Sequence, residues 1–295
     1  MGAVPIGLGT LQGLARRRVG SVQAARAAEG DDVAEGTGSR RRVVVVGASS
    51  GLGRCIAVGL AARGSAVALL ARRLDRLERA AADAGPAALA VACDVTDEES
   101  CREAMAQAAG GLGGIDALVY TPAIGHLSRV EATGFDAWQR VFATNVTGAS
   151  LVTAAALPHL KESAGVAVYL SSVSASETPP WPGLASYAVS KAALDKLVDA
   201  WRVEHPDVGF TRVVVGECAG GEGEAATGFA DSWDPDLLGD LVETWVARGH
   251  MTGALMDVRE LVEVVDAVSR TSPSVCVRSV TVAPRLVAPG DAQRP

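Results

Sequence analysis

Short apolar runs alternate with longer amphipathic stretches from residue 42 to residue 282. The first run, residues 43–46, is a series of valines with apolar side chains on both faces, which is typical of a strand buried inside a parallel sheet. The same pattern predicts further strands at residues 66–70, 87–92, 115–119, 166–171, 208–215 and 275–282. Helical periodicity predicts helices between them, at residues 52–63, 74–84, 97–109, 135–160, 184–203, 236–249 and 256–270.

Strands that alternate with helices in this way indicate a single doubly wound α/β domain over residues 40–285, with about seven parallel strands and helices on both faces. Ligands of such sheets bind at the carboxyl ends of the strands, near the point where the strand order reverses. Residues 1–39 are Arg-rich and then Gly/Asp/Glu-rich, so a disordered N-terminal extension is expected there, with a transit peptide as the alternative. Residues 286–295 are expected to be a tail.

The composition narrows the class of protein. Of 295 residues 48% are hydrophobic and 21% charged, which is ample for a core, and the net charge of −7 argues against a nucleic-acid or anionic-membrane partner. No apolar stretch approaches 18 residues, so no membrane-spanning helix is expected. The four histidines are scattered, so no metal site is predicted. The five cysteines show neither metal-ligand nor disulfide spacing, which favours a reduced, cytoplasmic location; three are expected in apolar surroundings, Cys55, Cys93 and Cys276.

A glycine-rich turn follows the first predicted strand and opens a helix. It reads Gly47-Ala48-Ser49-Ser50-Gly51-Leu52-Gly53. Glycines at this spacing permit a tight turn and a close approach of the backbone to a pyrophosphate, while the helix offers free N–H groups and its positive end. The turn therefore predicts a dinucleotide site that includes Gly47, Ser49, Ser50, Gly51, Leu52 and Gly53; the alternative is an ordinary tight turn.

Arginines follow the second predicted strand, where a carboxylate would bind the adenosine ribose and favour NAD. The chain carries Arg72 and Arg73 there. Guanidinium groups hold a 2′-phosphate by charge-assisted hydrogen bonds, so NADP is favoured over NAD; the alternative is that both arginines belong to a solvated helix face. After the third strand, Asp94 and Val95 are placed to contact the adenine, although Asp94 could equally cap the following helix.

A tyrosine and a lysine, Tyr187 and Lys191, lie four residues apart in a predicted helix and so share one face. The chain has three tyrosines and three lysines, so such a pair is expected by chance in only ~3% of chains of this composition. A free phenol has a pKa of about 10, too high for proton exchange at neutral pH. A neighbouring ammonium stabilises the phenolate and lowers that pKa.

Together the glycine turn, Asn145, the strand-ending pair Ser171-Ser172 and the Tyr187/Lys191 pair occur in the order typical of short-chain dehydrogenases/reductases, and the chain resembles that family over most of residues 42–282. The resemblance implies a Rossmann-type fold and hydride transfer between NAD(P) and a carbonyl or alcohol. It implies that Tyr187 is the general acid/base and that Lys191 lowers the Tyr187 pKa and binds the nicotinamide ribose. It further implies that Ser172 binds the substrate oxygen and that Asn145 holds a relay water. Ser174 suits the family's spacing to Tyr187 better, whereas Ser172 suits the strand end better.

Two loops depart from the family pattern. After the fourth strand, Tyr120-Thr121-Pro122-Ala123 replaces the usual Asn-Asn-Ala-Gly, so the asparagine that braces the sheet is missing; after the sixth, residues 217–221 replace the usual Pro-Gly. Residues 220–255 are expected to form the substrate loop and lid, with Phe229, Trp233 and Trp245. Trp181 is expected to line the pocket; the alternative for each tryptophan is packing in the core or the lid.

An NADP-dependent oxidoreductase acting on a small carbonyl or alcohol is therefore the expected function. A non-catalytic NAD(P)-binding sensor or regulatory protein of the same fold is the alternative, motivated by the changed loops. The resemblance also implies assembly as a homodimer or homotetramer.

Overall fold

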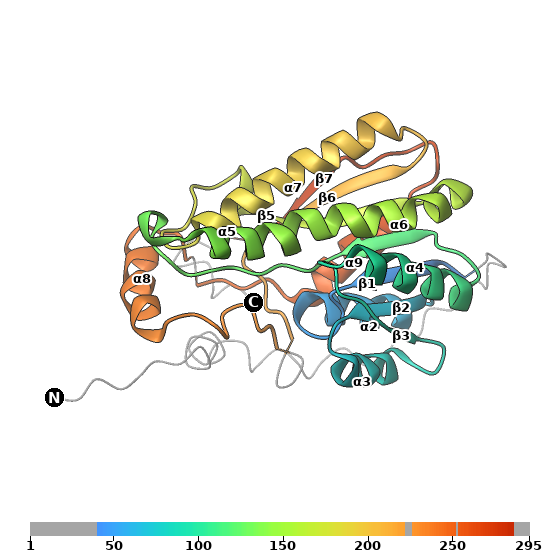
Figure 1. Ribbon diagram of the computed structural model, residues 1–295, viewed down its shortest axis with the longest axis horizontal. Coiled ribbons are helices and arrows are strands. Elements are labelled where there is room, and N and C mark those ends of the chain that lie inside the picture. Colours follow the sequence, from blue (N-terminus) through green and yellow to red (C-terminus); the bar gives the residue numbers. More distant parts are fainter. Residues whose placement is uncertain (1–39, 222–225, 252, 286–295) are drawn as a thin grey trace, which may run out of the picture.

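The protein folds around one seven-stranded, all-parallel sheet with the strand order β3-β2-β1-β4-β5-β6-β7 (Figure 1). This computed structural model describes residues 40–221, 226–251 and 253–285; the predicted extension, residues 1–39, and the tail, residues 286–295, lie outside them. The fold confirms the predicted doubly wound α/β class. The strands are β1 Arg42–Val46, β2 Ala66–Ala71, β3 Leu89–Ala92, β4 Ala117–Tyr120, β5 Val166–Ser172, β6 Gly209–Val215 and β7 Ser279–Val282.

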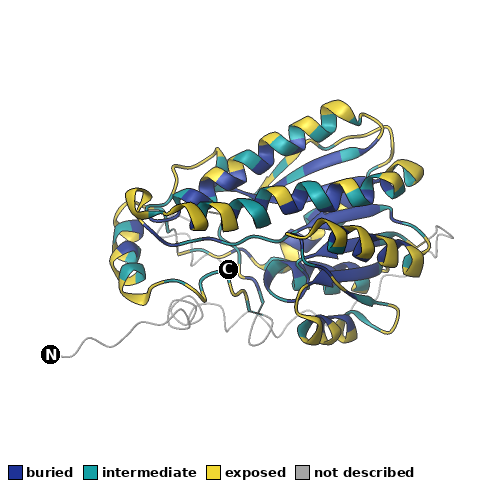
Figure 2. Ribbon diagram, viewed as in Figure 1, coloured by how far each residue is buried: buried dark blue, intermediate teal, exposed yellow. Residues whose placement is uncertain are grey.

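Helices cover both faces of the sheet, and the strands between them are largely buried (Figure 2). One core lies under α4, α6 and α7, where Met105, Val152 and Leu194 are fully buried. The other lies under α2, α3 and α9, where Ile56 and Leu261 are fully buried. The helix bounds are α2 Gly51–Ala62, α3 Leu74–Ala84, α4 Glu98–Leu112, α5 Phe135–Phe142, α6 Gly148–Ser163, α7 Ala185–Glu204, α8 Pro235–Ala247 and α9 Val258–Ser269, with short helical turns η1 Val130–Ala132, η2 Ala143–Thr147 and η3 Val173–Ala175.

The strand order reverses between β1 and β4. From β1 the chain runs outward through β2 to β3, then crosses back so that β4 pairs with the other side of β1. The carboxyl ends of β1 and β4 are therefore the place where ligands are expected to bind in a sheet of this kind. The glycine turn and the loop after β4 both start at this point.

The regular α-helical hydrogen bonding of one long helix is interrupted at Asn145, a predicted catalytic residue. Helices α5 and α6 form a continuous helix from Phe135 to Ser163, and η2 between them is a wider π-helical turn that contains Asn145. By length and composition alone this segment could cross a membrane, which the sequence analysis did not expect. In the structure it lies along the sheet, and Val152, Ala156 and Leu160 are fully buried in the core.

Three expectations from the sequence are corrected. The last strand begins at Ser279 rather than at residue 275, because pairing with β6 starts only at Arg212 opposite Ser279. Cys276 is exposed and Cys55 half-buried, so of the three cysteines predicted in the core only Cys93 is buried. The late start of β7 and the exposure of Cys276 have one cause: β7 is an edge strand, and the residues that lead into it are largely exposed. Cys55 lies on α2, where its side chain is only partly covered.

Candidate active site

The candidate catalytic side chains meet at the carboxyl end of β5. Ser172 is the last residue of β5, and Tyr187 lies in the first turn of α7. Lys191, one turn further along α7, is 2% exposed and places its Nζ 5.8 Å from the centroid of the Tyr187 ring. The Lys191 ammonium donates a hydrogen bond of 2.7 Å to Leu170 O, which fixes the amine against the end of the strand. The structure thus brings together three of the four predicted catalytic residues.

Burial shifts the pKa values of both members of this pair, and in opposite directions. Burial raises the pKa of Tyr187, and the hydrogen bond with Ser172 opposes that rise. Burial lowers the pKa of Lys191 to about 8, against the opposing effect of the Asp195 carboxylate. Lys191 is therefore largely protonated at neutral pH, and its positive charge lies next to the phenol that has to gain or lose a proton.

Two serines compete for the role predicted for Ser172. The hydroxyl oxygens of Ser172 and Ser174 lie 3.0 Å apart, and both residues are buried. The Ser172 hydroxyl is hydrogen-bonded to Tyr187, and Ser174 N donates to Ser172 Oγ. Ser172 is therefore the serine that contacts the phenol, and Ser174 is hydrogen-bonded to Ser172.

Asn145 joins the helix of η2 to the loop after β4. Its Oδ1 accepts a hydrogen bond from Ile124 N, and its Nδ2 donates to Ile124 O, each at 2.9 Å. A third bond of 2.8 Å runs from Nδ2 to Ser190 Oγ, and Ser190 in turn donates to Tyr187 O. The fully buried amide thus positions both the loop and the turn that carries Tyr187. Sequence reasoning missed Ser190, whose only signal is its place directly before Lys191.

A threonine takes the place of the missing asparagine after β4. Thr121 Oγ1 donates a 2.6 Å hydrogen bond to Val46 O, so it joins the end of β4 to the end of β1. The space around it is tight: a Cβ atom added to Gly47 would lie 2.6 Å from Thr121 Oγ1, and one added to Gly53 would collide with Thr121 Oγ1 and Gly47 O. Gly47 also has a φ of 82°, a conformation that favours glycine. The bracing that the sequence analysis regarded as lost is therefore supplied by Thr121.

The first turn of α2 has the properties of a phosphate site. Ser50 is its N-cap residue but makes no side-chain capping hydrogen bond, and the first turn contains no acidic residue. Gly51, with a φ of 57°, lies against Thr227, and Gly220 approaches Leu52 N. Backbone N–H groups at an uncapped helix N-terminus bind anions, and a Cβ at Gly51 would narrow the cradle. These residues fit the pyrophosphate of a dinucleotide, and Thr227 is a contact that the sequence analysis did not single out.

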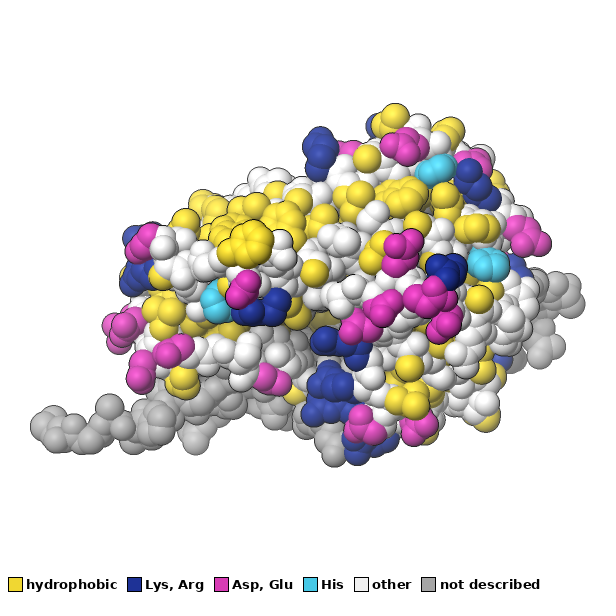
Figure 3. All heavy atoms as spheres, in the orientation of Figure 1, with side chains coloured by type: hydrophobic (Ala, Val, Ile, Leu, Met, Phe, Trp, Pro, Cys, Tyr) yellow, Lys and Arg dark blue, Asp and Glu magenta, His cyan; other side chains and the backbone are white. Residues whose placement is uncertain are grey.

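The two arginines after β2 occupy different positions. Arg73 Nη2 donates hydrogen bonds to Ser49 Oγ and Ser50 Oγ, at 3.2 and 3.0 Å, so it folds over the glycine turn. Arg72 is exposed, and its charge helps to lower the pKa of Asp94. Basic side chains, drawn in dark blue, also form a group on the face shown in Figure 3. The arrangement suits a phosphate group beside the turn.

Asp94, which follows β3, is not the N-cap residue of the next helix, so this alternative to its predicted role at the adenine is excluded. Asp97, not Asp94, caps α4, because its carboxylate accepts a hydrogen bond from Ser100 N. Asp94 Oδ1 instead accepts bonds from Thr96 N and Thr96 Oγ1. Partial burial acts to raise the pKa of Asp94, but these two bonds and the charge of Arg72 outweigh it and lower the pKa. Val95 is buried beside Gly148.

Sequence reasoning also missed a buried carboxylate below Lys191. Asp195 lies one turn further along α7, is 8% exposed, and places Oδ2 3.8 Å from Nη1 of Arg212 on β6. Burial raises the pKa of Asp195, while Ser171, Arg212 and Lys191 oppose that rise. Within the described residues no group of three or more His, Cys, Asp or Glu side chains could hold a metal ion.

Comparisons with known proteins agree with this geometry. The family model described as short chain dehydrogenase matches residues 41–230. An 11-beta-hydroxysteroid dehydrogenase A from Sesamum indicum is 36% identical over 180 residues, which are 59% of this chain and 51% of that protein. A serine 3-dehydrogenase from Rhizobium radiobacter is 33% identical over 219 residues, covering 70% of this chain and 87% of that protein.

The solved structure of an alcohol dehydrogenase from Thermococcus sibiricus, complexed with 5-hydroxy-NADP, superposes with a TM-score of 0.70 at 25% identity and covers 85% of this chain and 99% of that one. The chain spans about half the length of the first curated relatives that it matches.

Proposed function

This chain belongs to the short-chain dehydrogenase family, and we propose that it is an oxidoreductase that transfers a hydride between NADP and a carbonyl or alcohol substrate. The observation that carries the proposal is the buried Lys191 ammonium beside the Tyr187 ring, at the carboxyl edge of a sheet whose glycine turn fits a dinucleotide. The proteins named above that resemble it are dehydrogenases by their names.

In the proposed reaction Tyr187 gives a proton to the substrate oxygen during reduction, or takes it during oxidation. Lowering the pKa of the phenol from about 10 to about 7 requires roughly 4 kcal/mol of stabilisation of the phenolate. The ammonium of Lys191 contributes to that stabilisation, and the hydrogen bond from Ser172 adds to it. When bound, the nicotinamide supplies or accepts the hydride. Ser172 orients the substrate oxygen, and Asn145 holds the loop after β4 in place.

Three observations support NADP over NAD. The end of β2 carries no carboxylate, Arg73 lies over the glycine turn, and Arg72 is exposed beside it. The relative from Thermococcus sibiricus was solved with an NADP derivative. A guanidinium pair at this edge would bind a 2′-phosphate by charge-assisted hydrogen bonds that NAD cannot make.

The first test is equilibrium binding of NADPH and NADH to the purified chain, followed by energy transfer from tryptophan to nicotinamide. We expect NADPH to bind at least tenfold more tightly, and the double variant Arg72→Ala/Arg73→Ala to lose most of that preference. Arg79→Ala is the matched control, because Arg79 lies on α3 in an exposed ion pair with Asp75. Equal binding of both cofactors by the unchanged chain would contradict the NADP assignment.

Turnover decides between an enzyme and a binding protein. We expect the chain to oxidise NADPH in the presence of ketones, and Tyr187→Phe to reduce kcat at least a hundredfold while NADPH still binds. A Tyr187→Phe protein with full turnover would contradict the role of the phenol. NADPH binding without reduction of any carbonyl would favour the sensor or regulatory alternative, for which the changed loop after β6, residues 217–221, is the specific observation.

A further inference from the structure

Aromatic rings concentrate at the candidate active site. The chain has only twelve aromatic residues, yet five of them form one continuous series of ring contacts that begins at the catalytic phenol. The successive centroid distances are 5.0 Å from Tyr187 to Phe229, 5.2 Å from Phe229 to Trp233, 6.4 Å from Trp233 to Trp245 and 5.2 Å from Trp245 to Trp181. These five residues, here called the aromatic cluster, come from α7, α8 and two separate loops.

Phe229 is the member of the aromatic cluster whose ring contacts the Tyr187 ring. Its ring meets the Tyr187 ring edge-on, at 71°, and also rests on the backbone of Gly125 in the loop after β4. A Cβ atom at Gly125 would lie 2.5 Å from Cζ of Phe229, so the glycine is what lets the ring come so close. Because a substrate oxygen has to reach the Tyr187 hydroxyl, Phe229, whose ring contacts the Tyr187 ring, is a candidate to contact the group that carries this oxygen.

The indole N–H groups of Trp233 and Trp245 are turned into the protein. Trp233 Nε1 donates a 3.0 Å hydrogen bond to Gly125 O, and Trp245 Nε1 donates a 2.8 Å bond to Pro182 O. These bonds fix the two indoles and use up their donors, so the rings offer only apolar faces and edges to a ligand. The side chains packed behind them are also apolar: Leu127, Leu184 and Leu241.

The geometry points to a substrate class for the proposed reaction: we propose that the site takes ketones or secondary alcohols whose reacting carbon lies within a few bonds of an apolar ring, above all an aromatic ring, with Phe229 and Trp233 as specificity-determining residues. This inference rests on the proposed function. In the reduction, the carbonyl carbon gains the hydride, the carbonyl oxygen gains a proton from Tyr187, and NADPH is oxidised to NADP⁺. Contacts between aromatic rings contribute about 0.5–1.5 kcal/mol beyond burial, which corresponds to about 2- to 12-fold in kcat/KM.

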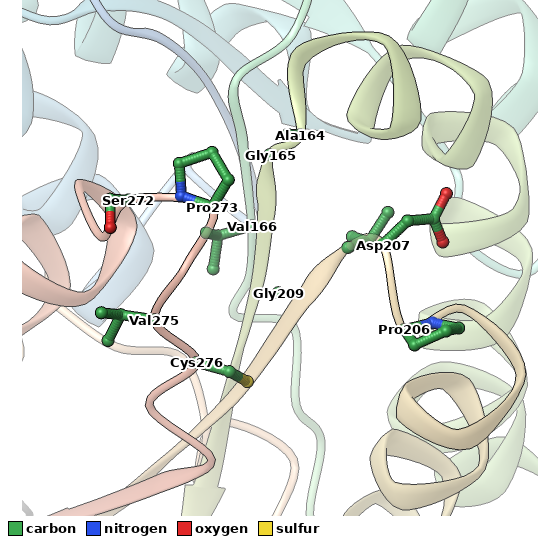
Figure 4. Close-up of a pocket in the computed structure, with 11 residues that line it drawn as sticks. Ala164, Gly165, Val166, Pro206, Asp207, Gly209, Ser272, Pro273, Val275 and Cys276 are labelled. Carbon is green, nitrogen blue, oxygen red and sulfur yellow. The ribbon is translucent and has the colours of Figure 1, made fainter.

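A hollow on the opposite edge of the sheet does not compete for this substrate. It is lined by residues such as Gly165, Asp207 and Cys276, at the amino ends of β5 and β6 (Figure 4). Its volume is about 40 Å³, which is space for water rather than for a ketone, since ligand pockets usually measure several hundred Å³. It also lies at the end of the strands away from Tyr187.

The test uses three methyl ketones of equal carbon number: benzylacetone, its cyclohexyl analogue and the linear ketone. Their carbonyl groups have the same immediate neighbours, so differences in kcat/KM report contacts of the distant group. With NADPH oxidation as the readout, we expect the order aromatic, then cyclohexyl, then linear. Phe229→Leu keeps an apolar side chain but removes the ring, and should lower the aromatic-to-cyclohexyl ratio about fivefold. Phe229→Ala also removes the apolar bulk of the side chain, so it should lower the aromatic-to-linear ratio of kcat/KM by more than Phe229→Leu does.

Trp138→Ala is the matched control, because Trp138 packs on Phe142 in α5, outside the aromatic cluster, and should leave both ratios unchanged. NADPH affinity and the melting temperature verify that each variant is folded. Preference of the unchanged chain for the linear ketone, or equal ratios in Phe229→Leu and the unchanged chain, would overturn this inference and leave the proposed function standing. Absence of turnover with every ketone, despite NADPH binding, would overturn the proposed function and this inference together.

Discussion

Lys191 and Asp195 are opposite charges one helical turn apart, both held in the interface between α7 and the sheet. Burial lowers the pKa of Lys191 to about 8, and the Asp195 carboxylate limits this fall. Ser171 on β5, Arg212 on β6 and Asp199 on α7 are the other polar or charged groups near that carboxylate. Asp195 does not touch the reacting atoms, so it is a positioning residue that keeps Lys191 charged.

Asp195→Asn should therefore move the alkaline limb of the pH–rate profile. With the carboxylate neutralised, only burial acts on Lys191, so its pKa falls below about 8 and the ammonium is lost at lower pH. We expect the alkaline limb of kcat/KM for ketone reduction to shift down by about 1 pH unit, with little change at pH 6. The measurement is kcat/KM from pH 5 to pH 10.

Two variants separate this effect from a loss of structure. Asp195→Glu keeps the negative charge, so the alkaline limb of its pH–rate profile should lie at the same pH as in the unchanged chain. Asp199→Asn removes a carboxylate that lies 4.0 Å from the same arginine, Arg212, but one turn further from Lys191, and should leave the limb in place. An unchanged limb in Asp195→Asn would refute the role of this carboxylate.

At the scale of elements, the π-helical turn η2 positions the site through one amide. Asn145→Ala removes three buried hydrogen bonds, two with the backbone of Ile124 and one with Ser190 Oγ. The two backbone groups of Ile124 lose these partners, at about 1–3 kcal/mol each, so we expect the free energy of unfolding to fall by about 2–6 kcal/mol. The Ile124 amide should exchange its hydrogen faster, because its acceptor is gone, and kcat should fall because the loop beside Tyr187 is released.

Thr153→Val is the control on the continuing helix α6. Thr153 is fully buried, donates to Ala149 O and contacts the Tyr169 hydroxyl, so its loss should also destabilise the fold. It lies away from the loop after β4, and hydrogen exchange at Ile124 should stay as in the unchanged chain. If both variants accelerated this exchange equally, the cause would be lower overall stability and not the loss of the hydrogen bonds between Asn145 and Ile124.

Element by element, the sequence predicted what local patterns determine. Strand β1 and helix α3 each begin and end within one residue of the predicted limits. Their patterns of apolar residues alone are enough to indicate which residues are buried. Residues 275–278 look as apolar as a strand, but β7 starts later because β6 covers it on one edge only. The limits of an edge strand depend on a partner that local pattern does not show.

The site was predictable where a residue type carries chemistry, and unpredictable where a role depends on neighbours distant in sequence. Tyr187, Lys191 and Ser172 meet as expected. By contrast, Thr121 braces the sheet because Val46 O lies opposite it, and Ser190 matters because η2 presents Asn145 to it. The assignment of NADP and of catalytic roles to these residues stays a prediction until the binding and turnover experiments are done.

At the scale of the whole molecule, part of the surface is apolar, which bears on the oligomeric state. Hydrophobic side chains gather over α5 and α7 on the face drawn in Figure 3, and Phe135 at the start of α5 is 73% exposed. Apolar surface of this kind is compatible with the expected homodimer or homotetramer. The oligomeric state stays a prediction, as does the cytoplasmic location.

An ion pair that stabilises the fold lies at the amino ends of the strands, whereas the candidate catalytic residues lie at the carboxyl ends. At the amino edge, Asp116 accepts hydrogen bonds from Arg42 N and Nε, at 2.8 and 3.0 Å, and pairs with Arg42 Nη2 at 2.5 Å. Its own backbone O accepts from Val166 N, so this one residue joins the starts of β1, β4 and β5. Partial burial acts to raise the pKa of Asp116, but the hydrogen bonds and charge of Arg42 outweigh it and lower the pKa.

Asp116→Asn should therefore cost stability without changing chemistry. We expect the free energy of unfolding to fall by about 2 kcal/mol at pH 7, because hydrogen bonds to a charged group contribute about 1.5–3 kcal/mol. A carboxyl with a depressed pKa stabilises the fold fully above its unfolded value of about 4, and this contribution is lost as the pH falls through the folded value. The difference in the free energy of unfolding between variant and unchanged chain, measured by urea unfolding, should accordingly shrink between pH 5 and pH 3.

The control is Asp75→Asn, in the exposed pair with Arg79, which should change the free energy of unfolding by less than about 0.5 kcal/mol. Because Tyr187 and Lys191 lie at the carboxyl edge, kcat/KM should stay within about twofold in both variants; a large loss of activity in folded Asp116→Asn would mean that the two edges are coupled through β4 and β5.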